Sequence, residues 1–413
     1  MNEYLMAIDL GTTKLAIIIA RETKKYISIE AIQSFPYTSD IQMDDWNNMD
    51  IVSILSEAVI WLKDIIGVES VRTILGIPGY HTGILENSYS IDIDGETITS
   101  YHISKAVEGC GKYPLPDEWH ILQTIPKLYT IDEQRSQVDV PIDMQGRTLT
   151  VNSSLVCINQ EFVSKLTGEL GKLGIHVDYV RPTLLSSGNV FLTETERQNG
   201  GILIDIGGRS TDIIIYRGGV PVYTDWIPVG GFNITSDLSI GMDIPFKQAE
   251  ELKGQCILGI NSSNTGKREQ LYMPLKIGEK IKDIPLNYIQ EIAELRVEEI
   301  FELIVESIDS SNVIDRKKCS AVLIGGGVAP IKGAKDFASV HLGCSNLRIG
   351  QPHLIDISNV EALASTYALI GEQAMEISSE GVETEDVRNR HIDDERISIK
   401  DRIIGWLSAF FNK

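Results

Sequence analysis

The feature that most constrains the fold is a short pattern that occurs twice in the chain. Residues 7–15 read AIDLGTTKL, and residues 203–211 read LIDIGGRST. Each copy has an apolar run, an aspartate, one apolar residue, a glycine and a short turn that leads into a second apolar run. This order is typical of a β-hairpin. The repeat therefore predicts two related lobes whose hairpins face each other across one cleft.

The rest of the chain alternates strand and helix patterns, as an α/β fold requires. Apolar groups at helical spacing predict a helix over residues 51–66, which ends at Gly67. A buried strand at 321–324 runs into three consecutive glycines. Short segments rich in turn residues between 81 and 160 indicate an inserted small α+β module. We expect further strands at residues 5–10, 15–20, 26–35, 71–77 and 200–216, and further helices at 161–173, 245–255 and 289–308.

The paired turns have the chemistry of a phosphate site. Small residues let backbone N–H groups approach phosphate oxygens closely. Asp9 and Asp205 precede the two turns, where their carboxylates could hold a hydrated Mg²⁺ beside a phosphate. Each hairpin alone could be an ordinary turn, but the pair, together with the glycines at 325–327, favours a triphosphate site. A dinucleotide fold is disfavoured because residues 325–330 read GGGVAP and lack the G-x-G-x-x-G spacing.

Composition excludes several other classes. Lys and Arg number 37 against 58 Asp and Glu, and the net charge of −21 argues against a general nucleic-acid binder. The five cysteines form no Cys-x-x-Cys pair, and the seven histidines show no metal-ligand spacing. The N-terminus lacks a signal-peptide pattern, and no apolar run approaches the ~20 residues of a spanning helix. We therefore expect a cytoplasmic protein whose contact with a membrane is peripheral.

Three segments resemble known nucleotide-binding motifs. Residues 9–14 (DLGTTK), 205–212 (DIGGRSTD) and 323–327 (LIGGG) look like the first phosphate, second phosphate and adenosine motifs of the actin, Hsp70 and sugar-kinase superfamily. Over nearly its whole length the chain further resembles the FtsA family of bacterial cell-division proteins, with similar segments at 120–150, 227–237, 249–253 and 348–352. The resemblance implies a two-lobed actin-like ATPase fold, with duplicated ribonuclease-H-like lobes, an inserted α+β subdomain and a C-terminal amphipathic helix.

The resemblance also implies how the chain is divided. The expected units are residues 1–80 and 161–199 in the first lobe, 81–160 in the insert, 200–371 in the second lobe with a smaller subdomain at about 227–310, 372–396 in an acidic flexible linker, and 397–413 in the terminal helix.

By this resemblance, ATP and Mg²⁺ are the expected ligands. Gly230 and Gly231 would approach the phosphates, while Glu250 and Lys253 would contact ribose and adenine. The i, i+3 spacing places both of those side chains on one helix face, although without the surrounding motifs this spacing is more typical of an exposed ion pair. Asp9 and Asp205 would hold the metal through water, and Asp205 is also the candidate catalytic residue. The predicted nucleotide-binding set is Asp9, Gly11, Thr12, Thr13, Lys14, Asp205, Gly207, Gly208, Arg209, Ser210, Thr211, Gly230, Gly231, Glu250, Lys253, Gly325, Gly326 and Gly327.

Two positions depart from the family pattern. Arg209 stands where the family usually has a third glycine, and its guanidinium could either clamp a γ-phosphate or point to solvent. The segment 180–183 reads VRPT, with Arg181 where the family usually carries Glu before Pro. Without that carboxylate, activation of water is in doubt. We therefore expect tight ATP binding with slow or absent hydrolysis.

The end of the chain has the pattern of a membrane anchor. Residues 371–396 carry nine acidic and three basic side chains, whereas 397–413 carry three basic and one acidic. On a helical wheel the large apolar side chains of the last segment fall on one face. A helix docked on the protein's own core, or one that binds a partner, is the alternative. The predicted membrane-binding residues are Arg396, Ile399, Lys400, Arg402, Ile403, Ile404, Trp406, Leu407, Phe410 and Phe411.

Together these expectations describe a protein that tethers filaments to the membrane during cell division. The resemblance implies that FtsZ is the bound filament, that the chain polymerises with itself like actin, and that it lies at the division site on the cytoplasmic side of the membrane, where anionic lipid is its partner. An actin-like assembly ATPase of type IV pilus machinery, or a phosphotransferase on the same fold, is the alternative.

Overall fold

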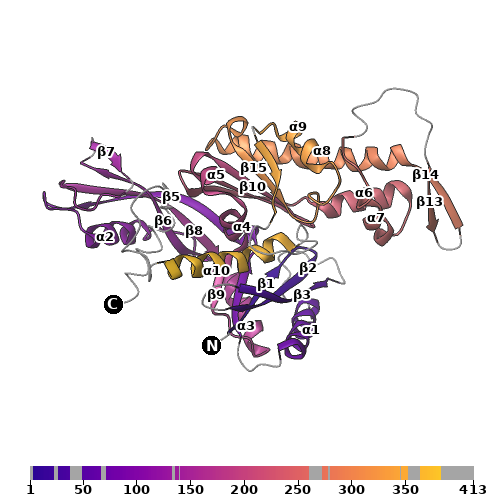
Figure 1. Cartoon of the computed structure of the whole chain (residues 1–413), viewed down its shortest axis with the longest axis horizontal. Helices are drawn as coiled ribbons and strands as arrows, with labels where there is room; N and C mark the ends of the chain where they lie inside the picture. Colours follow the sequence, from indigo (N-terminus) through magenta and orange to yellow (C-terminus); the bar gives the residue numbers. More distant parts are fainter. Residues whose placement is uncertain are drawn as a thin grey trace.

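The computed structural model describes residues 3–22, 27–37, 49–66, 71–132, 135–138, 140–259, 272–277, 280–344, 346–351 and 363–382. Within them the two copies of the repeated pattern build two similar sheets, as predicted (Figure 1). The first sheet has the order β3-β2-β1-β4-β9 and the second the order β12-β11-β10-β15-β16. In both, three antiparallel strands are continued by two parallel ones. The described chain is thus a two-lobed α/β protein.

The strand bounds follow the apolar runs of the sequence. The first sheet consists of β1 (Glu3–Leu10), β2 (Lys14–Glu22), β3 (Ile27–Pro36), β4 (Arg72–Ile77) and β9 (Tyr179–Pro182). The second consists of β10 (Gly201–Ile206), β11 (Thr211–Arg217), β12 (Val220–Ile227), β15 (Ser320–Ile324) and β16 (Asn346–Ile349). Asp9 and Asp205 occupy equivalent places near the ends of β1 and β10, where each strand turns into its hairpin partner.

Helices cover both faces of each sheet. The outer face of the first sheet packs on α1 (Met49–Ile66) and α3 (Gln160–Lys172). The outer face of the second packs on α6 (Gly231–Met242), α7 (Phe246–Lys253), α8 (Leu286–Ser311) and α9 (Ala334–Leu342). Between the sheets lie α4 (Thr183–Phe191) and α10 (Ala364–Val382), which share one apolar core with both of them (Figure 1). The short α5 (Glu194–Asn199) connects α4 to β10, and the hairpin of β13 (Tyr272–Ile277) and β14 (Lys280–Pro285) precedes α8.

The predicted α+β insert forms a separate sheet at one end of the molecule (Figure 1). It contains β5 (Thr82–Asp92), α2 (Ser100–Cys110), β6 (Trp119–Ile131), β7 (Arg135–Val138) and β8 (Thr148–Asn159). Its strand order is β5-β8-β6-β7, and α2 covers the sheet over a core of its own. The strands that enter and leave the insert, β5 and β8, pair along their whole length, from Thr82 opposite Ile158 to Asp92 opposite Thr148.

One predicted boundary is wrong. The acidic linker was expected to begin at residue 372, but α10 continues through the predicted start to Val382. Buried Tyr367, Ala368 and Leu369 anchor the helix, and the next two acidic side chains, Glu372 and Glu376, pair with Arg181. The rest of the linker and the predicted amphipathic helix at 397–413 lie outside the described residues. Among the helices of the described ranges, none has an apolar stretch long enough to cross a bilayer.

Candidate functional site

The two repeated turns open onto one cavity between the lobes. Its volume is about 520 Å³. Its wall contains the two hairpin turns that follow Asp9 and Asp205, and the glycine turn after β15. The first residues of α4 and α10 complete it. Of the predicted set, the residues in this wall are Asp9, Gly11, Thr12, Thr13, Lys14, Asp205, Gly207, Gly208, Arg209, Ser210, Gly231, Glu250, Lys253, Gly325, Gly326 and Gly327.

The two hairpin turns touch each other across the cleft. The backbone N–H of Arg209 donates to the hydroxyl of Thr12 at 2.8 Å. A Cβ atom at Gly208 would lie 2.3 Å from the methyl group of Thr13. Because real Cβ contacts are not that short, glycine at this position is what allows the turns of the two lobes to meet. The approach predicted from the repeat is therefore present.

The glycine turn after β15 packs backbone against backbone on the second lobe. In this turn, Gly327 N–H donates to Ile206 O at 2.8 Å. At the start of α6, Gly231 N–H donates to Gly207 O at 3.0 Å. Since β10 and β15 are parallel neighbours, their carboxyl ends meet at the same edge of the sheet. Three turns from distant parts of the sequence thereby present unobstructed backbone to one cavity.

Two predicted residues lie behind this wall rather than in it. Thr211 is fully buried and donates its hydroxyl to Val229 O at 2.8 Å. Gly230 packs against the β10–β11 turn, where a Cβ atom would lie 2.7 Å from the carbonyl oxygens of Gly207 and Gly208. Both residues shape the turns from behind.

Asp9 is held by hydroxyl groups that the sequence did not reveal. Its Oδ2 accepts from Ser365 Oγ at 2.7 Å and from Thr366 Oγ1 at 3.0 Å, both at the start of α10. Burial raises the pKa of Asp9, and these two hydrogen bonds and the charge of Lys14 act in the opposite direction. Burial lowers the pKa of the Lys14 ammonium, while Asp9 and Asp205 oppose that shift. Asp9 thus has a fixed orientation at the cavity.

Asp205 and Asp212 form the acidic part of the opposite wall. Burial, followed by the charge of Asp9, raises the pKa of Asp205 to about 7. The pKa of Asp212, which pairs with Asp205 in the β10–β11 ladder, is raised well above its ordinary value by burial and then by Asp205 and Asp9. The site is therefore short of positive charge, and both carboxyls keep a proton to higher pH than an exposed aspartate would.

This leads to a pH-dependent prediction. A carboxyl whose folded-state pKa is raised stabilises the fold fully below its ordinary value of 3.8, and that stabilisation is lost as the pH rises through about 7. Without nucleotide, the melting temperature should fall as the pH rises from about 5 to about 8. D205N should flatten part of this slope, as measured by thermal unfolding at each pH. An identical slope in both proteins would contradict the assignment.

Glu250 and Lys253 are integrated into the wall of the cavity. Lys253 is only 7% exposed, and its ammonium contacts Glu250 at 2.8 Å and donates to Gly231 O at 3.3 Å. The hydroxyl of Thr235 also donates to Glu250. The pair therefore connects α7 to the start of α6, with Lys253 buried and the Glu250 side chain 52% exposed.

Arg209 makes a contact that neither sequence alternative included. Its guanidinium carbon lies 3.7 Å from the centroid of the Phe232 ring, and Phe232 packs in turn on Phe246 with centroids 4.7 Å apart. A guanidinium over an aromatic face is a favourable cation–π arrangement. Arg209, a residue of the β10–β11 turn, is thereby held in the wall of the cavity.

Several cavity residues were missed by the sequence reasoning. They are Tyr37, Thr183, Leu184, Asp212, Phe232, Phe246, Ser365 and Thr366. Asp212 carried a usable signal, because it stands opposite Asp205 in any hairpin built on the repeat. The Ser365–Thr366 pair carried none, since it lies far along the chain from Asp9 and belongs to no glycine-rich pattern.

Comparison with known families and structures agrees with this architecture. The family model "Cell division protein FtsA" matches residues 202–368, and the model "SHS2 domain inserted in FTSA" matches residues 79–157. Cell division protein FtsA of Bacillus subtilis is 26% identical over 360 residues, which cover 86% of this chain and 80% of the relative. That of Escherichia coli K12 is 24% identical over 361 residues, covering 85% and 84%.

Solved structures place the fold among actin-like proteins. The PilM-PilN type IV pilus biogenesis complex aligns with a TM-score of 0.60 at 14% identity, over 91% of this chain and 98% of that one. MreB5 of Spiroplasma citri bound to ADP aligns with a TM-score of 0.50 at 14% identity, over 93% and 99%. With two hairpin turns meeting at a shared cavity, an insert that matches the SHS2 model of FtsA and sequence similarity over 86% of its length, the chain has an actin-like fold and is similar to the FtsA family of cell-division proteins.

Proposed function

We propose that this chain is an FtsA-type, ATP-binding actin homologue that acts in bacterial cell division. The observation that carries the proposal is the single cavity at which the β1–β2 turn, the β10–β11 turn and the glycine turn after β15 meet. Backbone N–H groups of the two hairpin turns would bind the polyphosphate, and Lys14 would neutralise part of its charge. Glu250 and Lys253, in the α7 part of the wall, would contact the nucleoside.

The acidic side chains fit a hydrated Mg²⁺. This ion keeps several waters and typically takes one or two protein carboxylates together with phosphate oxygens. Asp9 and Asp205 both line the cavity, and no three His, Cys, Asp or Glu side chains of the described residues form a closed metal cage. Bound Mg²⁺ would neutralise phosphate charge. Asp9, oriented by Ser365 and Thr366, and Asp205 would hold it through water.

Hydrolysis is expected to be slow or absent. Arg181, at the position where the family usually has Glu, is engaged with α10. The Oδ1 atom of Asp212 has no hydrogen-bond partner among the described residues, and burial raises the pKa of this carboxyl well above its ordinary value, which favours its protonated form. A protonated carboxyl is a poor general base. The cavity is thus better suited to hold ATP than to consume it.

The proposal extends to the membrane and to filaments. The apolar face predicted for residues 397–413 would insert into anionic lipid on the cytoplasmic side, so that the protein links FtsZ filaments to the membrane at the division site. An actin-like fold also supports self-association, since one structure of similar fold is titled "MamK double helical filament" (TM-score 0.50, 12% identity). The likeness to the PilM-PilN complex supports pilus assembly as a second candidate, but FtsA-type sequence over both lobes favours cell division.

Calorimetry and sedimentation with the full-length protein test the proposal. ATP with Mg²⁺ should bind at one site with a Kd of about 1 µM or tighter, equivalent to roughly −8 kcal/mol. Phosphate release should remain below one equivalent during the binding measurement. Anionic vesicles carrying the protein should pellet FtsZ filaments, and vesicles alone should not. Absence of heat from ATP would contradict nucleotide binding. Brisk multiple turnover would contradict slow hydrolysis, and failure to recruit FtsZ would contradict the role as a membrane tether.

A further inference from the structure

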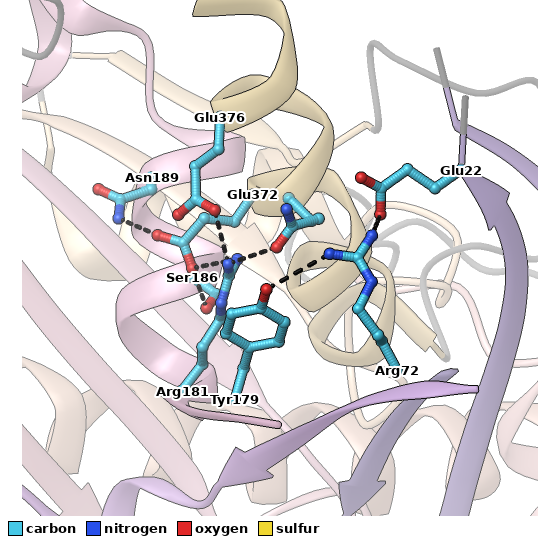
Figure 2. A network of polar contacts seen from close by, with 9 residues as sticks. Glu22, Arg72, Tyr179, Arg181, Ser186, Asn189, Glu372 and Glu376 are labelled. Atoms are coloured by element: carbon cyan, nitrogen blue, oxygen red, sulfur yellow. Dashed lines mark hydrogen bonds and ion pairs between the residues drawn. The ribbon is translucent and has the colours of Figure 1, made fainter. Parts of the chain in front are cut away.

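Helix α10 connects the cavity to a cluster of buried polar groups. Ser365 and Thr366, in its first turn, donate to Asp9 as described above. Glu372 lies seven residues after Ser365, which corresponds to about 10 Å along a helix axis. Glu372, Gln373 and Glu376 of the same helix face Arg181 at the end of β9 (Figure 2). The same helix, α10, therefore contacts both Asp9 and Arg181.

The cluster holds α10 through charges that are largely removed from solvent. Arg181 contacts Glu372 at 3.4 Å and Glu376 at 2.7 Å, and donates to Gln373 at 2.7 Å. The side chains of Arg181 and Glu372 are only 11% and 12% exposed. Removing one partner of a buried ion pair is strongly destabilising, because the other charge stays buried without compensation. The contact therefore fixes the position of α10 more strictly than an exposed ion pair would.

The partner helix α4 completes the clamp. Ser186 Oγ and Asn189 Nδ2 of α4 donate to the two carboxylate oxygens of Glu372 at 2.6 and 2.7 Å (Figure 2). At its own start, α4 places Thr183 and Leu184 in the cavity wall. Both helices thus begin at the cavity, and Glu372 joins them about two turns later. A shift of either helix along its axis would have to break these bonds.

We propose that Arg181 is a positioning residue for the metal carboxylate: by clamping α10 to β9, next to the bonds that join Glu372 to α4, it holds the Ser365 and Thr366 hydroxyls on Asp9 and so orients Asp9 for Mg²⁺. This rests on the proposed function. It gives Arg181 a role at a position where the family usually has a carboxylate. Removing a group that hydrogen-bonds to a metal ligand and orients it typically lowers metal affinity by 10- to 100-fold.

The test compares ATP affinity with Mg²⁺ and with EDTA in the full-length protein. R181M should reduce the gain in affinity that Mg²⁺ provides by about tenfold, while the affinity without metal changes much less. R181K, which keeps one charge, should restore most of the gain. R316M is the matched control, because Arg316 is similarly buried, with 14% of its side chain exposed, but pairs with Asp309 on α8 and donates to Leu342 O on α9; it should leave the gain unchanged.

A double-mutant cycle shows whether the effect passes through the hydroxyls. If Arg181 acts through them, R181M should add little to the variant S365A/T366V, whereas independent effects would add. Full additivity, or an equal loss of affinity with and without Mg²⁺, would overturn the inference and leave the proposed nucleotide site intact. Failure of the wild-type protein to bind ATP would instead refute the proposed function itself. Should R181M fail to fold, R181K and the hydroxyl variants still decide the question.

Discussion

Replacing Asp9 and Asp205 together with asparagine is expected to weaken Mg·ATP binding by at least about a hundredfold. Hydrogen bonds to charged groups contribute about 1.5–3 kcal/mol each, and every 1.4 kcal/mol is a factor of ten in affinity. Both carboxylates line the same cavity, one from each lobe. Isothermal titration calorimetry in the presence of Mg²⁺ measures the loss.

The control must separate a lost ligand from a damaged fold. D178N serves this purpose, because Asp178 accepts from the backbone N–H of Thr73 at 2.8 Å and has no place in the cavity wall. It should bind Mg·ATP like the wild-type protein. The double variant should retain cooperative unfolding, and in the absence of nucleotide it should be at least as stable at pH about 8, since two unfavourable buried charges are gone. An unchanged affinity for Mg·ATP would remove the basis for the site.

Truncation after residue 396 is expected to abolish binding to anionic vesicles. The segment that is lost carries Trp406, Phe410 and Phe411 among its apolar side chains. Burial of such side chains gains roughly 1.5 kcal/mol or more apiece, so the gross gain is on the order of 10 kcal/mol before ordering costs. Co-sedimentation of both proteins with vesicles of about one-third anionic lipid measures the difference.

Two further conditions separate the contributions to vesicle binding. Raising the salt concentration should weaken binding only in part, because apolar insertion is not screened. F410D should mimic the truncation, whereas N412D, on the opposite face of the predicted helix, should change binding little. Equal pelleting of the full-length and truncated chains would exclude the tail as the anchor.

The repeat was enough to predict the two sheets and the meeting of their turns. Glycine is required where backbones touch, as at Gly208, so a local pattern in the sequence reports a long-range contact. The Ser365 and Thr366 contacts to Asp9 could not be predicted in this way. They depend on how α10 lies between the sheets, and neither residue type distinguishes a buried donor from an ordinary helix start.

The linker was predicted too early for a related reason. A high density of acidic residues usually indicates a solvated segment, but Glu372 and Glu376 face Arg181, which is nearly two hundred positions earlier in the chain. Charge composition does not show whether a partner exists elsewhere. The position of Arg209 over Phe232 was equally hidden, because it depends on the side-chain conformations of residues from two different elements.

The attachment of the insert has an evolutionary consequence. Its first and last strands leave the first lobe side by side and stay paired to their ends, so the chain enters and leaves the module at a single place, and strands of the module also pack on β12 of the second lobe. Substitutions on its outer surface can therefore accumulate without moving any group around the cavity. The outer surface of the insert can thus diverge in sequence while the walls of the cavity stay the same.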